Sequence, residues 1–367
     1  MGGIDLTELS VEEKVGQLLF IGIPGPELDA ATVELLDAVH PGGICLFARN
    51  IKTAEQTRTL LEGIKGSLKV VPLLSLDQEG GRVDRLRRLI TPMPAAGQLR
   101  TAEDARELGA IIGEALSLLG FNMNFAPVVD VIDASRRDLI NGLQTRGLGI
   151  TKEEVVEFAD AFLDSLSEHG ISGCLKHFPG LASARIDSHE ELPAIPTKRQ
   201  ELNSIDLYPY QKLINRNGVS VMIAHATYPN ADLQEKDANG NLLPSSLDPR
   251  IVTSLLRDEL NFTGLAITDD LEMGAIVRHY GIGEASKLAV HAGEDMLAIC
   301  ANAGAIYEAH SALTKAVESG DISEARLDES IRRIADLKEM VPEAPEFHAD
   351  RLAEIDERIK KLNQHLN

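Results

Sequence analysis

Short, apolar, β-branched runs alternate along the chain with longer amphipathic runs, and this alternation constrains the fold more than any other feature. Eight strand-like runs can be counted, each followed by a helical pattern. This order predicts an α/β fold, a closed TIM-type (β/α)8 barrel of parallel strands, with functional groups at the carboxyl ends of its strands. The expected strands are 18–23, 43–47, 71–76, 123–129, 173–178, 219–224, 265–268 and 296–299.

Helix start signals and a late break define the rest of the chain. SVEE at 10–13, TAEQ at 53–56 and TKEE at 151–154 each match the capping box, in which side chains satisfy the free amides of a first turn. Beyond the last expected strand, helical patterns continue to about residue 366, with a PEAP break at 342–345. We therefore expect a barrel over 1–341 and a C-terminal helical extension over 342–367 packed on its outside.

Charge and cysteine usage exclude several classes of partner. Lys and Arg number 36 against 57 Asp and Glu, a net charge of −21, which repels phosphate backbones and anionic membrane surfaces. Cys45, Cys174 and Cys300 are far apart in apolar runs, as is typical of reduced core thiols in a cytoplasmic protein. No basic region leads into an apolar N-terminal stretch, and no run of eighteen apolar residues occurs. We expect no nucleic acid, no export signal and no membrane span.

The segment KHFPG at 176–180, followed after six residues by Asp187-Ser188-His189, concentrates groups that move protons. In an extended segment side chains repeat every two residues, so Asp187 and His189 are expected on one side, where the carboxylate orients the ring and favours its protonated form. Such a pair can act as an acid/base unit. Lys176 and His177 are neighbours on a strand, so we expect them to point to opposite faces and only one to enter the barrel.

Two further segments place carboxylates just past expected strands. The run ITDDL at 267–271 ends in Asp269, which could supply a nucleophile, and in Asp270, which is expected to point away from it. Asp77 opens DQEGGR at 77–82, where two glycines permit the tight turn that aims a carboxylate into a cavity. Arg85, one helical turn past Arg82, could reach the same cavity as a fixed donor to hydroxyls or a carboxylate.

Two other residues are ambiguous on local pattern alone. Arg146, in QTRG at 144–147, is by itself an ordinary loop arginine. His225 ends the sixth expected strand and is as consistent with a supporting role as with contact to a ligand.

Taken together and in this order, the segments resemble the bacterial single-domain β-N-acetylglucosaminidases of glycoside hydrolase family 3, which act in peptidoglycan recycling. The segments that carry the resemblance, within about residues 9 to 340, are VGQLL at 15–19, GICLFARN at 43–50, DQEGGRV at 77–83, KHFPG at 176–180, DSH at 187–189 and ITDDLEMGAI at 267–276. The resemblance implies a retaining mechanism and no metal or organic cofactor. It implies that Asp269 is the nucleophile, His189 the acid/base and Asp187 its partner, and that the sugar is held by Asp77, Arg85, Arg146, Lys176 and His177.

The chain departs from the usual family pattern at two places near this site. Leu181-Ala182 follows KHFPG where His-Gly is common, and Gly147-Leu148 follows Arg146 where Ser and an aromatic residue are usual. Because the six-residue gap and the Asp-Ser-His triplet are retained, we expect an altered rate or specificity and not a dead site.

The resemblance implies a cytoplasmic exo-hydrolase that removes terminal β-linked N-acetylglucosamine from small soluble muropeptides. The low aromatic content, 4% with no Trp, also favours a small ligand held by hydrogen bonds and charges. Phosphorolysis is an alternative, since a His acid/base adds no fixed negative charge to repel phosphate. A sugar-binding homologue with weakened catalysis is another. A metal-dependent barrel hydrolase is a third, with His177, His189, His225 and Asp269 as ligands.

Overall fold

The computed structural model describes residues 8–139 and 141–367. The first seven residues, which include most of the segment used to predict the absence of an export signal, lie outside the described part. No helix in the described part is both long enough and apolar enough to cross a bilayer.

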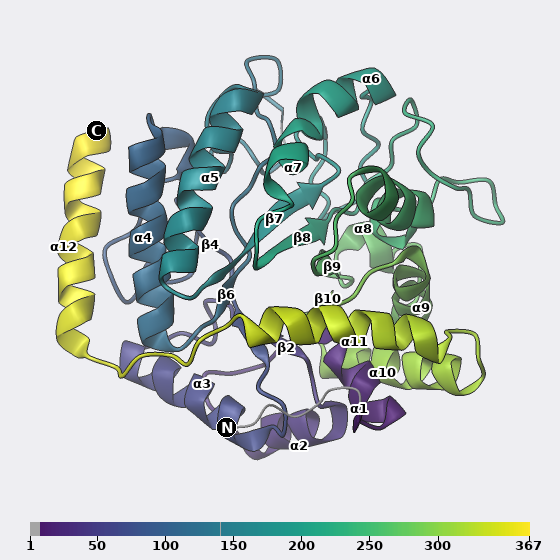
Figure 1. Ribbon diagram of the computed structural model, residues 1–367. Helices are drawn as coiled ribbons and strands as arrows, with labels where there is room; N and C mark the ends of the chain where they lie inside the picture. Colours follow the sequence, from purple (N-terminus) through teal and green to yellow (C-terminus); the bar gives the residue numbers. More distant parts are fainter. Residues whose placement is uncertain (1–7, 140) are drawn as a thin grey trace.

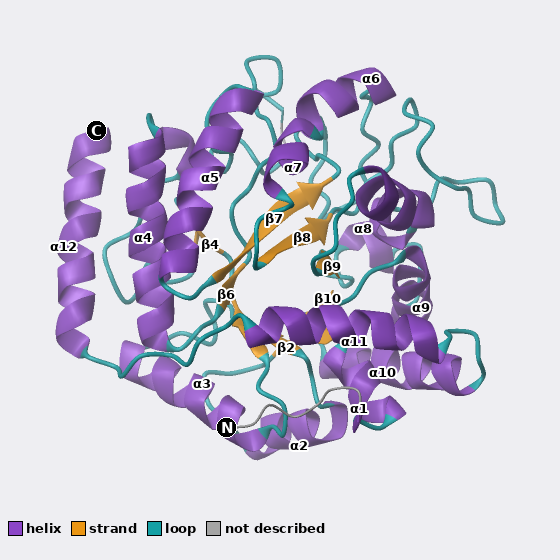
Figure 2. Ribbon diagram, in the orientation of Figure 1, coloured by secondary structure: helices purple, strands orange, loops and turns teal. Residues whose placement is uncertain are grey.

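Two four-stranded parallel sheets form the centre of the molecule, where Figure 2 shows strands enclosed by helices. One has the order β10-β1-β2-β3, and the other β6-β7-β8-β9. These strands are almost wholly buried, as expected for parallel sheets covered by helices. Their bounds are β1 Leu19–Gly22, β2 Gly43–Cys45, β3 Leu73–Ser75, β6 Met123–Asn124, β7 Ser172–Phe178, β8 Val219–Ile223, β9 Ala266–Thr268 and β10 Leu297–Ile299.

The two sheets meet at both of their edges, but no continuous ladder of backbone hydrogen bonds runs through all eight strands. At one edge Asn122 N donates to Leu74 O at 3.1 Å, and at the other Thr268 N donates to Met296 O at 3.1 Å. The predicted α/β class with parallel strands is confirmed, and each predicted strand is present, in a shorter form except for β7, which starts one residue earlier than predicted. The predicted single eight-stranded ladder is not formed, because regular pairing between β3 and β6 and between β9 and β10 gives way to isolated bonds.

Helices surround the sheets and connect successive strands (Figure 1). A short antiparallel hairpin follows β3, formed by β4 Gln78–Gly80 and β5 Val83–Asp84. The α-helices are α1 Val11–Gln17, α2 Ala30–Val39, α3 Ala54–Ser67, α4 Ala102–Leu119, α5 Lys152–Glu168, α6 Arg199–Glu201, α7 Tyr208–Leu213, α8 Gly274–Val277, α9 Ile282–Ala292, α10 Ala303–Glu318, α11 Glu324–Glu339 and α12 Ala349–Leu366. Single turns of 3₁₀-helix cover Ala96–Gln98 and Ser245–Leu247, and π-helical turns cover Leu202–Asp206 and Arg250–Glu259.

The predicted capping boxes are complete at two of three helices. Ser10 at α1 and Thr151 at α5 accept from the backbone three residues on, and the glutamate there binds back to the cap. At α3, Thr53 accepts from Gln56 N, but the Gln56 side chain instead accepts from Lys52 N at 2.9 Å. Only half of the predicted box therefore forms at α3.

The last helix, α12, lies alongside α4 at the edge of the molecule (Figure 1). Ile355 and Ile359 are fully buried on the inner face of α12. Arg358 donates to Glu107 at 2.9 Å and to Glu114 at 2.8 Å, both on α4. Burial of apolar side chains thus fixes α12 in place, and the partly exposed ion pairs add less.

Candidate active site

The polar residues singled out in the sequence gather at the carboxyl ends of the parallel strands. Asp77 follows β3, Lys176 and His177 end β7, and Asp269 follows β9. Asp269 N donates to Ile223 O at 3.0 Å, so that its loop leaves the sheet beside the end of β8. Carboxylates and cations from different strands therefore share one end of the fold, as the prediction of a barrel site requires.

The β4–β5 hairpin positions the site residues that follow β3, Asp77 and Arg85. Gln78 is fully buried, and its Oε1 accepts the Arg85 N–H at 2.8 Å while its Nε2 donates to Asp84 at 2.8 Å. Gly80 and Gly81 adopt positive φ angles of 91° and 59° at the turn. A side chain on Gly80 would meet Pro94 O at 2.2 Å, so this turn requires glycine.

A network of buried ion pairs joins this hairpin to β7 and to the loop before α5. Lys176 Nζ donates to Asp77 Oδ1 at 2.8 Å and lies 2.7 Å from Glu79 Oε1. Arg146 binds Glu79 with two parallel bonds of 2.8 and 2.9 Å. Arg85 donates to the other oxygen of Asp77 at 3.3 Å. Four predicted sugar-holding residues are thus brought together around Glu79.

The charges of this network stabilise one another. Burial opposes ionisation of Asp77, but Lys176, Arg85 and Arg146 hold the pKa of this carboxyl well below its ordinary value. The same balance, set by Lys176 and Arg146, lowers the pKa of Glu79 to about 2. Burial favours the neutral form of Lys176, but the two carboxylates raise its pKa above the ordinary value. The network is therefore fully charged at neutral pH.

His177 lies beside this network and pairs with Asp130, which follows β6. Its Nδ1 is 2.7 Å from Asp130 Oδ2, and the same oxygen accepts the His177 N–H at 3.1 Å. The prediction that only one of Lys176 and His177 enters the site is wrong, because both contact carboxylates at the ends of neighbouring strands. The register with β8 shifts between Leu175 and Phe178, so the alternation of side chains is interrupted there.

Asp187 and His189 form the expected pair, but the backbone that carries them does not have the expected extended conformation. His189 Nδ1 lies 2.7 Å from Asp187 Oδ1, which also accepts the His189 N–H at 3.0 Å. The segment is a turn and not an extended strand, and this local turn brings the two groups together. Burial would raise the pKa of Asp187, but His189 and Arg146 lower it. The His189 side chain is 70% exposed.

Asp269 and Asp270 occupy different environments, as predicted. Asp269 Oδ1 accepts the Asp270 N–H at 2.9 Å. Asp270 Oδ1 accepts the Glu272 N–H at 3.0 Å, and burial raises the pKa of Asp270 to about 7. Asp270 thus caps the turn that precedes α8, whereas the N-cap residue of α8 itself, Met273, makes no side-chain capping bond.

His225 supports the backbone of these two aspartates. Its Nε2 lies 3.0 Å from Asp270 O, and its Nδ1 lies 2.7 Å from Ser246 Oγ. Burial lowers the pKa of His225 despite the opposing charge of Asp269, and His189 lies near enough to lower it further. A neutral His225 can donate from Nε2 and accept from Ser246, and it has no free ring nitrogen left for a ligand.

Glu79 and Asp130 belong to this site, although the sequence analysis assigned a role to neither of them. Glu79 is 4% exposed and neutralises both Lys176 and Arg146, while Asp130 is 2% exposed and orients His177. The sequence did contain a signal for these two acids, because cations that are buried near a strand end require carboxylates nearby. Both acids lie in the segments that follow β3 and β6.

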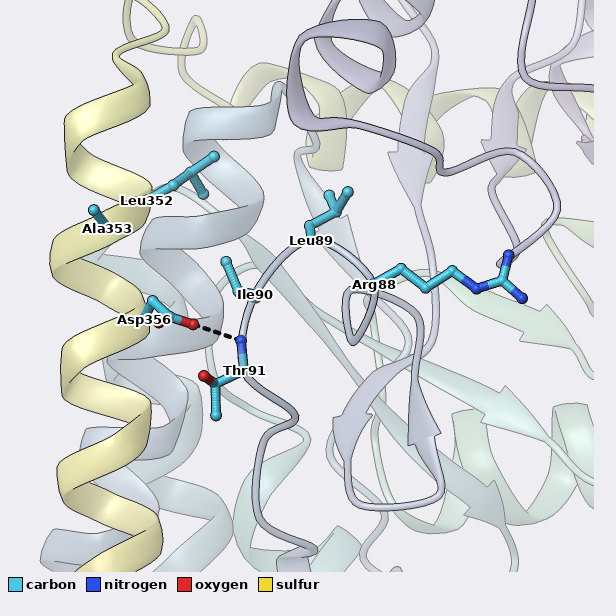
Figure 3. A pocket seen from close by; sticks show the side chains of 7 residues that line it. All are labelled: Arg88, Leu89, Ile90, Thr91, Leu352, Ala353 and Asp356. Carbon is cyan, nitrogen blue, oxygen red and sulfur yellow. Dashed lines mark hydrogen bonds between the residues drawn. The ribbon is translucent and has the colours of Figure 1, made fainter.

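Two other observations bear on what the site could bind. No group of three or more His, Cys, Asp or Glu side chains within 8–139 and 141–367 is arranged to hold a metal ion. A separate hollow of about 340 Å³ lies between α12 and the segment 88–91, where Asp356 Oδ1 accepts the Thr91 N–H at 2.5 Å (Figure 3). None of the predicted site residues lines this hollow.

Carboxylates, buried cations and histidines thus gather at the carboxyl-end side of parallel strands, where enzymes with this kind of α/β fold carry their active sites. Comparison with known proteins identifies the family. Residues 10–337 match the model of the glycosyl hydrolase family 3 N-terminal domain. The chain therefore belongs to glycosyl hydrolase family 3, and it is a glycosidase.

Curated relatives agree with this assignment. A "Beta-hexosaminidase" from Idiomarina loihiensis is 32% identical over 78% of this chain and 85% of its own length. Another "Beta-hexosaminidase", from Haemophilus influenzae, is 32% identical over 77% of this chain and 79% of its own length.

Solved structures show the same fold. A family 3 β-N-acetylglucosaminidase from Paenibacillus sp. is 34% identical with a TM-score of 0.85, covering 96% of this chain and 69% of that one. A family 3 member from Mycobacterium smegmatis is 32% identical with a TM-score of 0.81, covering 91% of this chain and 98% of that one.

Proposed function

We propose that the protein is a retaining exo-β-N-acetylglucosaminidase in which Asp269 attacks the anomeric carbon and His189 protonates the departing oxygen. Its enzyme class, a β-N-acetylhexosaminidase, is supported by the family match and by the names of its curated relatives. The observation that carries the mechanism is the 2.7 Å contact between His189 and Asp187 on a loop bonded to the segment that carries Asp269. In the second step, neutral His189 activates the water that releases the glycosyl-aspartate.

The sugar-holding role belongs, in this proposal, to Asp77, Arg85, Arg146, Lys176 and His177. The buried network supports it, because groups held by Glu79 and Asp130 need little reorganisation when a sugar binds. The Arg85 Nε atom is buried and has no hydrogen-bond partner among the described residues. Asp77 is 20% exposed at its side chain, which leaves an acceptor for a hydroxyl group.

We further propose that the substrate is a small muropeptide, cleaved in the cytoplasm during peptidoglycan recycling. The three buried, free cysteines support a reducing compartment. We also propose that the two sheets work as one closed (β/α)8 barrel over 1–341, with 342–367 as an extension on its outside. The bonds across both sheet edges support closure, and the packing of α12 on α4 supports the extension.

Trapping with a fluorinated N-acetylglucosaminyl donor followed by peptide mapping tests the mechanism. The label is expected on Asp269, and Asp269→Asn is expected to abolish both labelling and turnover. Asp270→Asn is the matched control, because an amide at 270 can still accept the Glu272 N–H, and it should remain labelled at Asp269. A label on any other residue would overturn the assignment.

Phosphorolysis is kept as the second candidate, because His189 brings no fixed negative charge to the acid/base position. Product analysis in phosphate and in phosphate-free buffer separates the two reactions. Hydrolysis predicts free N-acetylglucosamine in both buffers, whereas a sugar 1-phosphate formed only in phosphate would establish phosphorolysis. If a chromogenic N-acetylglucosaminide is bound but never cleaved, the chain is a sugar-binding homologue.

A further inference from the structure

The loop that carries Asp187 and His189 meets the segment after Asp269 through main-chain bonds. Gly274 N donates to His189 O at 3.1 Å, and Ala275 N donates to Ser188 O at 3.3 Å. Gly274 and Ala275 are the first residues of α8, whose initial amides have no acceptor within the helix. The loop therefore supplies acceptors that α8 itself lacks.

The contact at Gly274 is too close for any side chain. A Cβ atom at this position would lie 2.3 Å from Glu190 O and 2.8 Å from His189 O, both of them backbone atoms. Gly274 is not among the residues with positive φ, so its backbone does not require glycine for conformational reasons. The neighbouring loop alone excludes a side chain here, and a methyl group would displace it by about 1 Å to restore van der Waals contact.

Few other contacts hold this stretch of the loop. Among the described residues, hydrogen bonds and ion pairs from 185–192 to the rest of the chain all end within 274–278. Besides the two main-chain bonds, they comprise the pair of Arg278 with Glu191 at 3.2 Å, in which both side chains are more than half exposed. Such an exposed pair contributes little, so within 185–192 the main-chain bonds at Gly274 and Ala275 do most to position the stretch, while Asn141 holds the residues just before it through Ala184 O.

We propose that Gly274 is a positioning residue for the acid/base group: the absence of its side chain sets the place of His189 relative to Asp269. This inference rests on the proposed function. One short segment then carries Asp269, the proposed nucleophile, and five residues later Gly274, against which the loop of His189 packs. A displacement of about 1 Å in a reacting group can lower the rate about 10²-fold.

The test compares Gly274→Ala with Gly281→Ala. A Cβ at Gly281 would find only Glu308 Oε1, at 3.8 Å, and the φ of Gly281 is −72°. The kcat/KM of each variant is measured with a 2,4-dinitrophenyl N-acetylglucosaminide, which needs no protonation, and with an N-acetylglucosaminyl disaccharide, which does. Gly274→Ala is expected to lose about 10²-fold on the disaccharide and less than about threefold on the dinitrophenyl substrate. Gly281→Ala should match the wild type on both.

Equal losses on the two substrates, or no loss on either, would overturn the inference. Retained activity on the dinitrophenyl substrate also shows that the variant folds. Ala275→Pro serves as a second variant, because it removes the N–H that binds Ser188 O, and a smaller loss with the same substrate dependence is expected.

Limited proteolysis separates this inference from the proposed function. Arg185 is exposed at the start of the loop stretch, so tryptic cleavage after Arg185 reports its release. Cleavage is expected to be several-fold faster in Gly274→Ala than in Gly281→Ala or the wild type. Unchanged cleavage in Gly274→Ala would refute the proposed contact between the loop and Gly274, whatever the activity of the wild type. A wild type that is inactive on N-acetylglucosaminides would refute the proposed function and leave the cleavage result to be judged separately.

Discussion

Replacing Glu79 by Gln should destabilise the protein by an amount that the structure allows us to calculate. The Glu79 carboxylate is 3% exposed and neutralises Lys176 and Arg146, whose side chains are 2% and 14% exposed. Its pKa is lowered from 4.5 to about 2. At 1.36 kcal/mol per pKa unit this corresponds to about 3 kcal/mol, close to the 3–5 kcal/mol typical of breaking a buried ion pair.

The sign of the pH dependence follows from the same shift. Because the folded-state pKa of Glu79 is depressed, its stabilisation is complete above the ordinary pKa of 4.5 and is lost as the pH falls towards 2. The difference in unfolding free energy between wild type and Glu79→Gln should therefore fall from about 3 kcal/mol at neutral pH to less than half of that near pH 3.

Urea unfolding at several pH values measures this difference. Glu62→Gln is the control, because the Glu62 side chain is 57% exposed in its pair with Arg58 and should change stability by less than about 1 kcal/mol. If Glu79→Gln unfolds at the same urea concentration as the wild type at neutral pH, the network does not stabilise the fold as argued. A difference that stays constant down to pH 3 would show that the loss has another cause.

Three other substitutions test separate parts of the structure. His225→Ala should remove one of the two donors to the part-buried carbonyl of Asp270, leaving only Met273 N–H at 3.0 Å, and lower kcat by about tenfold, whereas His225→Gln, which can still donate, should recover part of the loss in steady-state assays. Burial lowers the pKa of Lys338 to about 7, so the wild type should gain stability from pH 7 to 10, and Lys338→Met should flatten that rise in urea unfolding. Asn141→Ala should loosen the start of the His189 loop, because Asn141 Nδ2 donates to Ala182 O and Ala184 O at 2.9 and 3.2 Å; faster hydrogen exchange in 181–190 would show this, and unchanged exchange would contradict it.

Local patterns predicted the strands because each strand is a short apolar run that is buried on both faces. They did not predict how the sheets divide, since pairing between neighbouring strands depends on contacts far apart in sequence. The Asp187–His189 contact was predicted for the wrong reason. The spacing suggested an extended segment, whereas a turn brings the same two groups together, because an Asp side chain readily accepts the amide two residues later.

The partners of the predicted cations were harder to find. Lys176 and Asp77 are 99 residues apart in sequence, and Arg146 and Glu79 are 67 apart. Nothing in the local sequence of Arg146 distinguishes it from an exposed loop arginine. Its place in the site depends on Glu79, which lies within the DQEGGR motif but was not considered as a counter-charge.

The two halves of the site are held in place by different means, and this difference bears on how they work. The groups proposed to hold the sugar are linked by short ion pairs in which Lys176 and Glu79 are almost fully buried, so their geometry should change little when a sugar binds. The proposed acid/base, His189, is mostly exposed and depends on a turn and on main-chain bonds at α8. Such a contact can break without unpairing a buried charge, so it costs far less to open. Local opening in this site should therefore concern the loop of His189, while the buried ion-pair network stays intact.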